Sequence, residues 1–141
     1  MSEQAATAKV DFAGAAWVDA ARSVLEELVA EHCDDDTRLS VCEVFTDVPE
    51  RVAPSGTAAW YFYIKGRSVT VGAGEVDDTD VKIRADYETA LPGARTVYTP
   101  EIVAELSSRP PPEPPPDIQG DTSIFPAWLV ELHNKMALIT A

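Results

Sequence analysis

The stretch that decides the fold spans residues 58–87 and reads AAWYFYIKGRSVTVGAGEVDDTDVKIRADY. Apolar and polar residues alternate in three runs within it, and turn-forming residues separate the runs. This pattern predicts three consecutive β-strands at residues 58–65, 68–73 and 80–86. Gly66 can adopt the positive φ that a tight turn between the first two strands needs.

The first of these strands holds the densest aromatic cluster in the sequence. Period two places Trp60, Phe62 and Ile64 on one face and Tyr61 and Tyr63 on the other. Because both faces carry rings, neither is predicted to be a plain solvent face. We expect the Trp60 face to form the floor of an apolar interior. The tyrosine face should look toward a partner, a proline-rich segment further along the chain, or solvent.

A long amphipathic helix is predicted before the strands, at residues 11–32, with Asp11 as its cap. Its apolar residues recur at three- and four-residue spacings and form one stripe, made of Trp17, Ala21, Val24, Leu25, Leu28 and Val29. An acidic loop at residues 34–36 should follow it. Residues 39–46 are rich in β-branched and aromatic side chains and predict one more strand. The strands are expected to pair in an antiparallel manner.

Two short helices are predicted after the strands. Asp86 can cap the first, which Pro92-Gly93 should end. Thr99 can cap the second, with Pro100 at its first helical position. Six prolines within residues 109–116 then predict an extended surface connector.

The C-terminal part predicts a short strand at residues 117–121 and a final amphipathic helix. Asp121 or Ser123 is expected to cap this helix, and Pro126 is tolerated in its first turn. The apolar stripe of the helix consists of Phe125, Trp128, Leu129, Leu132, Met136 and Ile139.

Length, charge and cysteine content bound the class of protein. A chain of 141 residues predicts one domain, which we place at residues 11–141 after a flexible tail at residues 1–10. The net charge of −13 makes nucleic acid a poor partner. No run approaches the roughly 20 apolar residues of a membrane span, so no stable membrane insertion is expected. No signal peptide is visible, and Cys33 and Cys42 form no disulfide framework, which together predict a cytoplasmic protein with free thiols.

Reactive groups are few. His32 and Cys33 precede the acidic loop, but adjacent residues at a helix end point in different directions, so no metal site is predicted. Residues 77–80 resemble the start of a calcium loop without its later glycine and glutamate, and they predict an acidic hairpin turn. His133 has polar neighbours and is expected at the surface or half-buried. No nucleophile motif or dinucleotide motif is present, so no catalytic residue and no cofactor are predicted.

The many aromatic side chains admit two interpretations. They can fill a packed core, or helices can cover the sheet and leave an apolar cavity between the two layers. In the second case we expect the cavity wall, and the ligand-binding residues, to be Trp17, Phe45, Trp60, Phe62, Ile64, Tyr87, Trp128, Leu132 and Met136.

The order of elements resembles the sterol carrier protein 2 (SCP2-like) family over roughly residues 17–139. The resemblance rests on the glycine turn in IKGRSVTVGAGE, the strand DVKIRADYE, the I-x-G-D step at residues 118–121 and the closing helix. It implies an α+β fold, with a mixed or mostly antiparallel sheet of about five strands covered on one face by helices. It also implies a hydrophobic tunnel for sterol, fatty acyl or similar ligands, without catalytic residues. The proline run at residues 109–116 departs from the family pattern.

Three functions are compatible with the sequence. The favoured one is non-catalytic binding or carriage of a hydrophobic, lipid-like small molecule. The second is a small enzyme acting on a hydrophobic substrate, which would need a buried carboxylate, tyrosine or histidine with a shifted pKa facing the cavity. The third is an interaction subunit, a homodimer joined through Tyr61 and Tyr63.

Overall fold

The structure is a computed structural model that describes residues 9–108 and 117–140. The predicted connector at residues 109–116 and most of the predicted N-terminal tail, residues 1–8, lie outside the described residues. No helix in the described part of the chain is long and apolar enough to cross a membrane.

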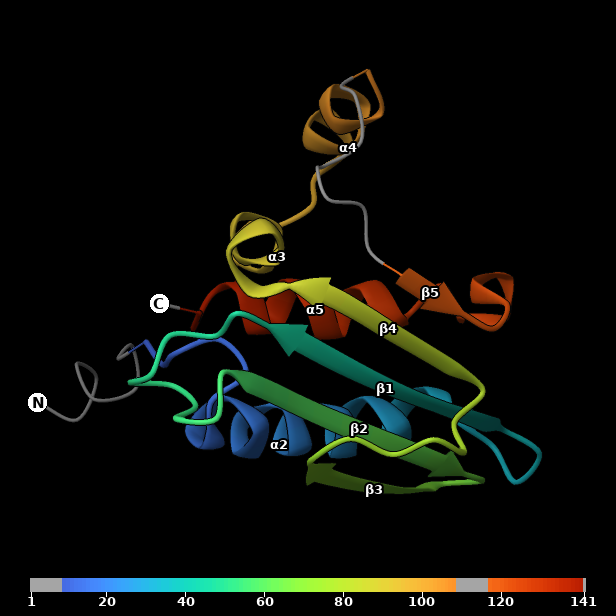
Figure 1. Cartoon of the computed structure of the whole chain (residues 1–141). Helices are drawn as coiled ribbons and strands as arrows, with labels where there is room; N and C mark the ends of the chain where they lie inside the picture. The colour runs from blue at the N-terminus through green and yellow to red at the C-terminus, as the bar shows by residue number, and fades with distance from the viewer. Residues whose placement is uncertain (1–8, 109–116, 141) are drawn as a thin grey trace, which may run out of the picture.

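The described residues form an α+β arrangement: a long helix precedes four consecutive strands, and two helices, a short strand and two further helices follow (Figure 1). The elements, in chain order, are α2 (Ala15–His32), β1 (Arg38–Thr46), β2 (Thr57–Lys65), β3 (Ser68–Ala73), β4 (Val81–Asp86), α3 (Tyr87–Ala94), α4 (Pro100–Ser107), β5 (Asp117–Gln119), the 3₁₀ helix η1 (Thr122–Ile124) and α5 (Leu129–Ala137).

The strands form one five-stranded mixed sheet in the order β3-β2-β1-β4-β5. Strands β2 and β3 form a hairpin around Gly66, whose φ of 64° is the positive value that the turn needs. The pairs β1–β2 and β4–β5 are also antiparallel, whereas β1 and β4 are parallel. The predicted fold class, a mixed or mostly antiparallel sheet of about five strands, and the predicted strand positions are confirmed; the pair β1–β4 departs from the antiparallel pairing expected between the strands.

The parallel pair arises because the chain crosses the sheet between β3 and β4. Residues 77–80 were predicted as a hairpin turn, but together with residues 74–76 they carry the chain past β2 and β1 (Figure 1). The Tyr63 hydroxyl donates to Asp78 at 2.5 Å, and the Lys82 ammonium lies 2.5 Å from Glu75 and 2.6 Å from Asp77. The acidic side chains of this segment therefore pair with residues on the sheet face opposite to the helices, an arrangement that local sequence spacing does not encode.

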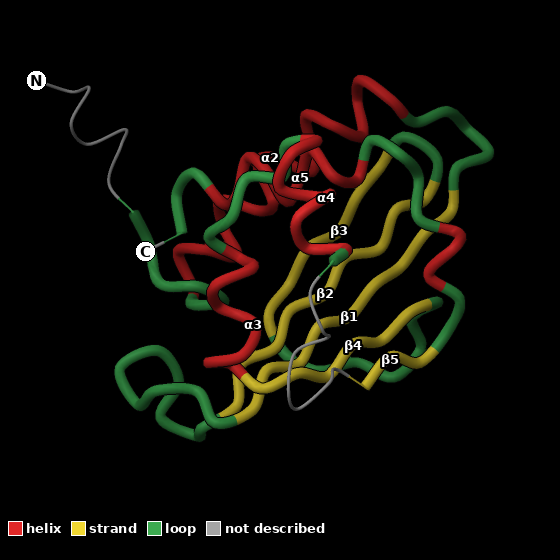
Figure 2. Tube along the Cα trace, turned by 90° about the horizontal axis from the view of Figure 1, so that it is seen from above, coloured by secondary structure: helices red, strands yellow, loops and turns green. Residues whose placement is uncertain are grey.

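Helices α2, α3 and α5 gather on one side of the sheet, as Figure 2 shows. Figure 1 shows α4 standing apart from the sheet, beyond α3. As predicted, Asp86 caps α3, since its carboxylate accepts from the Thr89 backbone N–H at 3.0 Å, and the Thr99 hydroxyl accepts from the Ile102 N–H at 3.2 Å before α4. Helix α3 continues to Ala94, one residue past the Pro92-Gly93 pair at which it was expected to end.

The first long helix begins later than predicted. Gly14 is its N-cap residue, and no side chain caps it, so Asp11 does not have the predicted role. Val10 instead forms a parallel bridge with Thr140, and the following turn places Phe12 in the core. Ala13 has a positive φ of 63° and Gly14 is extended, so helical geometry begins only at Ala15.

The last helix also begins later than predicted. Asp121 caps only the short helix η1, through a bond from the Ser123 backbone N–H at 2.9 Å. Helix α5 starts at Leu129, whose N–H donates to the Pro126 carbonyl at 3.0 Å. Pro126 therefore precedes the helix rather than lying in its first turn.

Helix α2 packs its predicted apolar stripe against the sheet and α5. The buried residues of this helix are Trp17, Val18, Ala21, Leu25, Leu28 and Val29. Full burial of one such aliphatic side chain contributes roughly 1.5–3 kcal/mol. Beside this stripe, the Arg22 guanidinium pairs with Asp19 at 2.7 Å and donates to the Val71 carbonyl of β3 at 3.1 Å, which ties α2 to the edge of the sheet.

Candidate ligand pocket

A pocket with a volume of about 670 Å³ lies between the sheet and the helices. Strands β1, β2 and β4 supply its floor, and α2, α3, α5 and the segments before α2, α4 and α5 supply the rest. Its lining is almost entirely apolar and comprises Phe12, Trp17, Val41, Glu43, Phe45, Trp60, Phe62, Ile83, Ala85, Thr89, Ala90, Gly93, Ala94, Tyr98, Phe125, Pro126, Ala127, Leu129, Val130, Leu132, His133 and Met136. Val130 lines the pocket and is 45% exposed, so the pocket opens to solvent beside α5.

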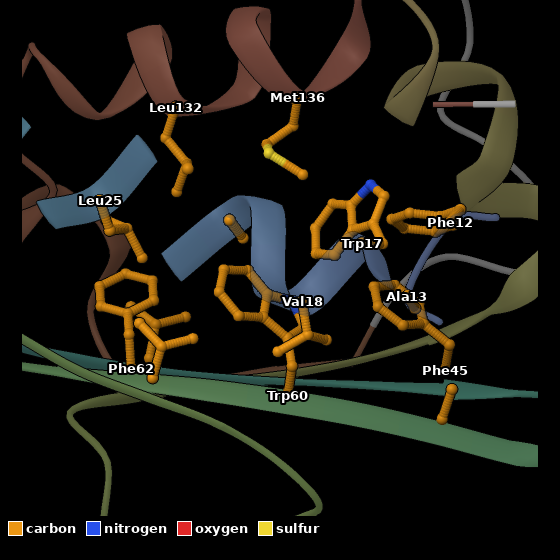
Figure 3. Close-up of a cluster of buried hydrophobic side chains, with 14 of the residues drawn as sticks. Phe12, Ala13, Trp17, Val18, Leu25, Phe45, Trp60, Phe62, Leu132 and Met136 are labelled. Carbon is orange, nitrogen blue, oxygen red and sulfur yellow. The ribbon is translucent and has the colours of Figure 1, made fainter. Parts of the chain in front are cut away.

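The alternation of side chains along the strands builds the floor. Phe62 of β2 lies opposite Val41 of β1, and Trp60 lies opposite Glu43. In Figure 3, Trp60 and Phe62 rise from the sheet while Leu132 and Met136 reach toward them from α5.

Small side chains leave room on the other side of the pocket. Ala85 of β4 meets Ala90, Gly93 and Ala94 of α3 around the same space. The rings of Phe45, Trp60, Phe62 and Trp17 come from β1, β2 and α2, whereas these small residues come from β4 and α3. The two layers cannot close over this side, and an open volume results.

Ring contacts fix the aromatic end of the pocket. The Phe12 ring centroid lies 5.3 Å from that of Trp17, 4.7 Å from Phe45 and 5.4 Å from Tyr87 (Figure 3 shows the first three). Trp17 packs edge-on against Trp60 at 5.2 Å. Such edge-to-face contacts add about 0.5–1.5 kcal/mol to the burial of the rings, so this part of the wall is rigid.

One carboxyl group stands among these apolar side chains. Trp60 donates its indole N–H to Glu43 at 2.7 Å, and no other bond to this carboxyl is formed within the described residues. Glu43 is half-buried, and it borders the pocket. Desolvation raises the pKa of Glu43 above its ordinary value, while the indole N–H acts in the opposite direction.

His133 is the second titratable group on the wall. Its Nε2 lies 2.8 Å from the Thr96 carbonyl, and its ring stacks on Tyr98 at a centroid distance of 4.1 Å. Burial lowers the pKa of His133, and the bond to a carbonyl assigns the proton of the neutral ring to Nε2. The neighbouring Asn134 accepts from the Tyr98 N–H at 2.8 Å, so α5 holds the segment before α4 in place. The predicted half-buried position of His133 is confirmed.

These polar groups do not form a recognisable catalytic set. Within the described lining there is no serine or cysteine, and the Thr89 hydroxyl donates to Asp86 at 3.0 Å. Both cysteines are buried outside the lining, where desolvation raises the pKa of their thiols. In residues 9–108 and 117–140, no three His, Cys, Asp or Glu side chains are grouped to hold a metal ion. The described lining therefore offers mainly apolar surface with a few polar groups.

No protein-family model matches the sequence, and no curated protein matches it either. Among solved structures, the chain is similar to a conserved hypothetical protein from Thermus thermophilus. The name of that protein suggests that it is a sterol carrier protein. That match has a TM-score of 0.52 at 16% sequence identity and covers 95% of this chain and 94% of the other. The chain has an SCP2-like fold.

Two other solved structures with SCP2 in their names match at lower TM-scores. Palmitated SCP2L2 from Aedes aegypti gives 0.43 at 16% identity, over 82% of this chain and 93% of that chain. The UbiJ-SCP2 ubiquinone synthesis protein gives 0.42 at 15% identity, over 89% of this chain and 86% of that chain. The SCP2-like fold confirms the resemblance seen in the sequence. A fold does not fix a function, so the pocket must carry the functional argument.

Most of the predicted wall residues line the pocket of this SCP2-like fold, namely Trp17, Phe45, Trp60, Phe62, Leu132 and Met136. Ile64 is buried one step further along β2, outside the lining. Tyr87 is buried behind Phe12 and donates its hydroxyl to the Phe12 carbonyl at 2.9 Å. Trp128 stacks on His32 at 5.5 Å instead, and His32 also contacts Glu131 at 3.3 Å, so this ring covers the junction of α2 and α5.

Several residues that line the pocket were not predicted from the sequence. Period two puts Glu43 on the same strand face as Val41 and Phe45, and an acidic residue flanked at i±2 by large apolar ones is the signal that could have found it. Phe12 was hidden because the helix was expected to begin before it. The small residues of α3 carry no chemical signal, since only the packed structure shows that they face open space.

Replacing Glu43 with glutamine should make the protein more stable at neutral pH, by on the order of 1 kcal/mol, because the amide keeps an oxygen for Trp60 and removes the cost of desolvating a half-buried carboxylate. The folded state holds the Glu43 proton more tightly than the unfolded chain does. The stability that Glu43 contributes by binding this proton is therefore complete below the ordinary pKa of 4.5, and it is lost as pH rises through the raised pKa. The gain from Glu43→Gln should accordingly fade as pH drops toward 4.5.

Urea unfolding of both proteins across this pH range measures the effect. Glu27→Gln, the same chemical change on the exposed face of α2, calibrates the removal of one charge from a chain of net charge −13. Identical pH profiles for the two variants would show that Glu43 has no special environment.

Proposed function

We propose that the protein binds a hydrophobic, lipid-like small molecule non-covalently in this pocket, and carries or stores it. The observation that carries the proposal is the apolar pocket of about 670 Å³ under α5 and α3. Ligand sites in proteins commonly measure roughly 300–1,000 Å³ and combine an apolar lining with a few polar groups. The lining here has that composition.

The driving force would be burial of the ligand's hydrocarbon. Each buried methylene contributes about 0.8 kcal/mol, so an alkyl chain or fused-ring body gains several kcal/mol on entering the pocket. The rigid ring contacts among Phe12, Trp17 and Trp60 keep the wall formed without ligand, which lowers the cost of ordering it. The SCP2-like fold adds an analogy with the sterol carrier function suggested for the Thermus protein.

Binding can be tested with the neutral dye N-phenyl-1-naphthylamine, whose emission rises in apolar surroundings. We expect saturable binding by the wild type, with energy transfer from Trp17 and Trp60, which border the pocket. The double variant Ala85→Phe/Ala90→Phe fills the small-residue side and should weaken binding by about tenfold or more, a loss of about 1.4 kcal/mol.

Ala30→Phe is the matched control, because this alanine lies on the exposed face of α2. It should leave the affinity unchanged. Mass spectrometry of the native protein should in addition reveal a copurified lipid. Lack of saturable dye binding by the folded wild type would remove the proposed function.

An enzyme acting on a hydrophobic substrate is a second candidate, favoured by one observation. Glu43 and His133 both border the pocket and both have shifted pKa values, which is the feature that such an enzyme requires. Carriage and catalysis differ in what is recovered after incubation with protein. A carrier returns its ligand unchanged, whereas an enzyme returns a product.

The cytoplasmic location and the homodimer stay predictions. Tyr61 and Tyr63, the residues of the suggested dimer seam, already have contacts within the chain: the Tyr63 hydroxyl bonds to Asp78, and Tyr61 packs on Gly72. Light scattering on the purified protein would give a monomer mass if Tyr61 and Tyr63 do not form a seam. A hydrophobic small molecule is the partner that the pocket favours.

A further inference from the structure

Glu43 occupies the centre of the pocket floor. It lies near the middle of β1, the central strand, between the inward-facing Val41 and Phe45. Its cross-strand neighbours are Trp60 on β2 and Ile83 on β4. The carboxyl is thus surrounded by apolar and aromatic side chains on the sheet, where an unpaired polar group is costly.

The hydrogen bonding of this carboxyl is incomplete. Oε1 accepts the indole N–H of Trp60 at 2.7 Å, and no donor among the described residues reaches Oε2. A carboxyl group has about four acceptor positions, so a single bond leaves most of its capacity unused. The side chain lines the pocket, and a donor that enters the pocket can use that capacity.

The charges around the pocket favour some head groups over others. The described lining contains no lysine or arginine, and its titratable members are Glu43, His133 and Tyr98. His133 already donates to the Thr96 carbonyl, so it offers no free N–H from Nε2. A ligand carboxylate or phosphate would find an acidic neighbour and no cationic partner, and two like charges in one apolar site cannot both ionise without a large cost.

We propose that Glu43 is the head-group acceptor of the pocket, so that the protein selects apolar ligands carrying a hydrogen-bond donor, a hydroxyl or an amine, over fatty acids and other anionic lipids. The donor would bond to the carboxyl oxygen that Trp60 leaves free, while the hydrocarbon extends along Phe62, Leu132 and Met136. This inference rests on the proposed function, because it specifies which lipid-like molecules the pocket accepts.

Competition with the bound dye tests the selectivity near neutral pH. The competitors are dodecanol, dodecylamine and dodecanoate, which share one alkyl chain and differ only in the head group. We expect the alcohol and the amine to bind at least about tenfold more tightly than the acid, which is about 1.4 kcal/mol and within the range of one hydrogen bond to a charged group. A much tighter amine would identify an ion pair with Glu43, and equal binding of alcohol and amine a neutral hydrogen bond. Both results support the assignment.

The variant Glu43→Gln links the selectivity to this residue. Its amide can donate to a carboxylate and no longer carries a like charge, so dodecanoate should gain about tenfold in affinity and the preference should collapse. Glu27→Gln, outside the pocket, should keep the wild-type preference. Circular dichroism and dye binding establish that each variant is folded.

The possible failures are distinguishable. If the wild type binds dodecanoate as tightly as dodecanol, or if Glu43→Gln retains the full preference, Glu43 is not the head-group acceptor, although the pocket still binds lipid. If the folded wild type binds neither the dye nor any of the three competitors, the proposed function fails together with this inference. Equal binding of dodecanoate and dodecanol by the wild type overturns the assignment even if a variant folds poorly.

Discussion

Replacing Trp60 with alanine should lower the free energy of unfolding by about 3–5 kcal/mol, the cost of removing a large aromatic side chain from a packed core. Trp60 is 3% exposed, and its ring contacts those of Trp17 at 5.2 Å and Phe62 at 5.6 Å. The truncation also removes the only donor to Glu43 within the described residues, which leaves a carboxyl without a partner.

Trp60→Phe separates these two causes. Phenylalanine keeps most of the ring packing but has no N–H, so the loss should be about 1–3 kcal/mol, because the half-buried Glu43 carboxyl loses a hydrogen bond. Combining Trp60→Phe with Glu43→Leu should recover part of that loss, because the unsatisfied carboxyl is removed. Urea unfolding of the wild type, Trp60→Ala, Trp60→Phe and the double variant measures the contributions of the ring packing and of the hydrogen bond. A loss below about 1 kcal/mol for Trp60→Ala would contradict the packed wall described above.

Replacing Gly120 with alanine should be the most damaging change in the β5 region, with an expected loss of about 2–4 kcal/mol. Gly120 follows β5 with a φ of 101°, a conformation that is strained for any residue with a side chain. A Cβ at this position would also collide with the backbone carbonyl oxygen of Asp80, which precedes β4. The backbone cannot yield easily, because the Asp80 carboxylate accepts from the Ser40 N–H at 3.0 Å and the Asp80 N–H donates to the Ser40 hydroxyl at 2.7 Å.

Gly74→Ala is the matched control for this prediction. Gly74 has a similar φ of 114°, but a Cβ there would meet nothing within 4 Å. It should cost only the backbone strain, about 1–2 kcal/mol. Equal unfolding free energies for the two variants would show that the contact between Gly120 and Asp80 does not hold β5 in place.

The strands could be predicted from the sequence because their signal is local. Alternating apolar residues mark β2 and β3, and Gly66 marks the turn between them. The parallel partner of β1 could not be predicted in this way. The choice of this partner depends on the path that residues 74–80 take across the sheet. Along that path Asp77 pairs with Lys82, and Asp78 accepts from the Tyr63 hydroxyl.

The pocket was predictable in kind and only partly in detail. Aromatic residues on an inward strand face, such as Trp60 and Phe62, were correctly expected at the interior. Trp128 was expected on the same helical stripe as Leu132 and Met136. It stacks on His32 outside the pocket instead, because the rotation of α5 depends on its contact with α2. The open volume itself depends on small residues such as Ala90, whose effect appears only when the layers are assembled.

The bond from Arg22 to the edge of the sheet has a consequence for solubility. The outer strand β3 is the type of exposed edge at which a second molecule can add a strand and begin aggregation. The guanidinium of Arg22 occupies the Val71 carbonyl, one of the acceptors in this strand, and places a long charged side chain beside it. An arriving strand would have to displace that bond and desolvate the charge. Helix α2 thus protects the β3 edge from intermolecular β-sheet growth while its other side covers the core.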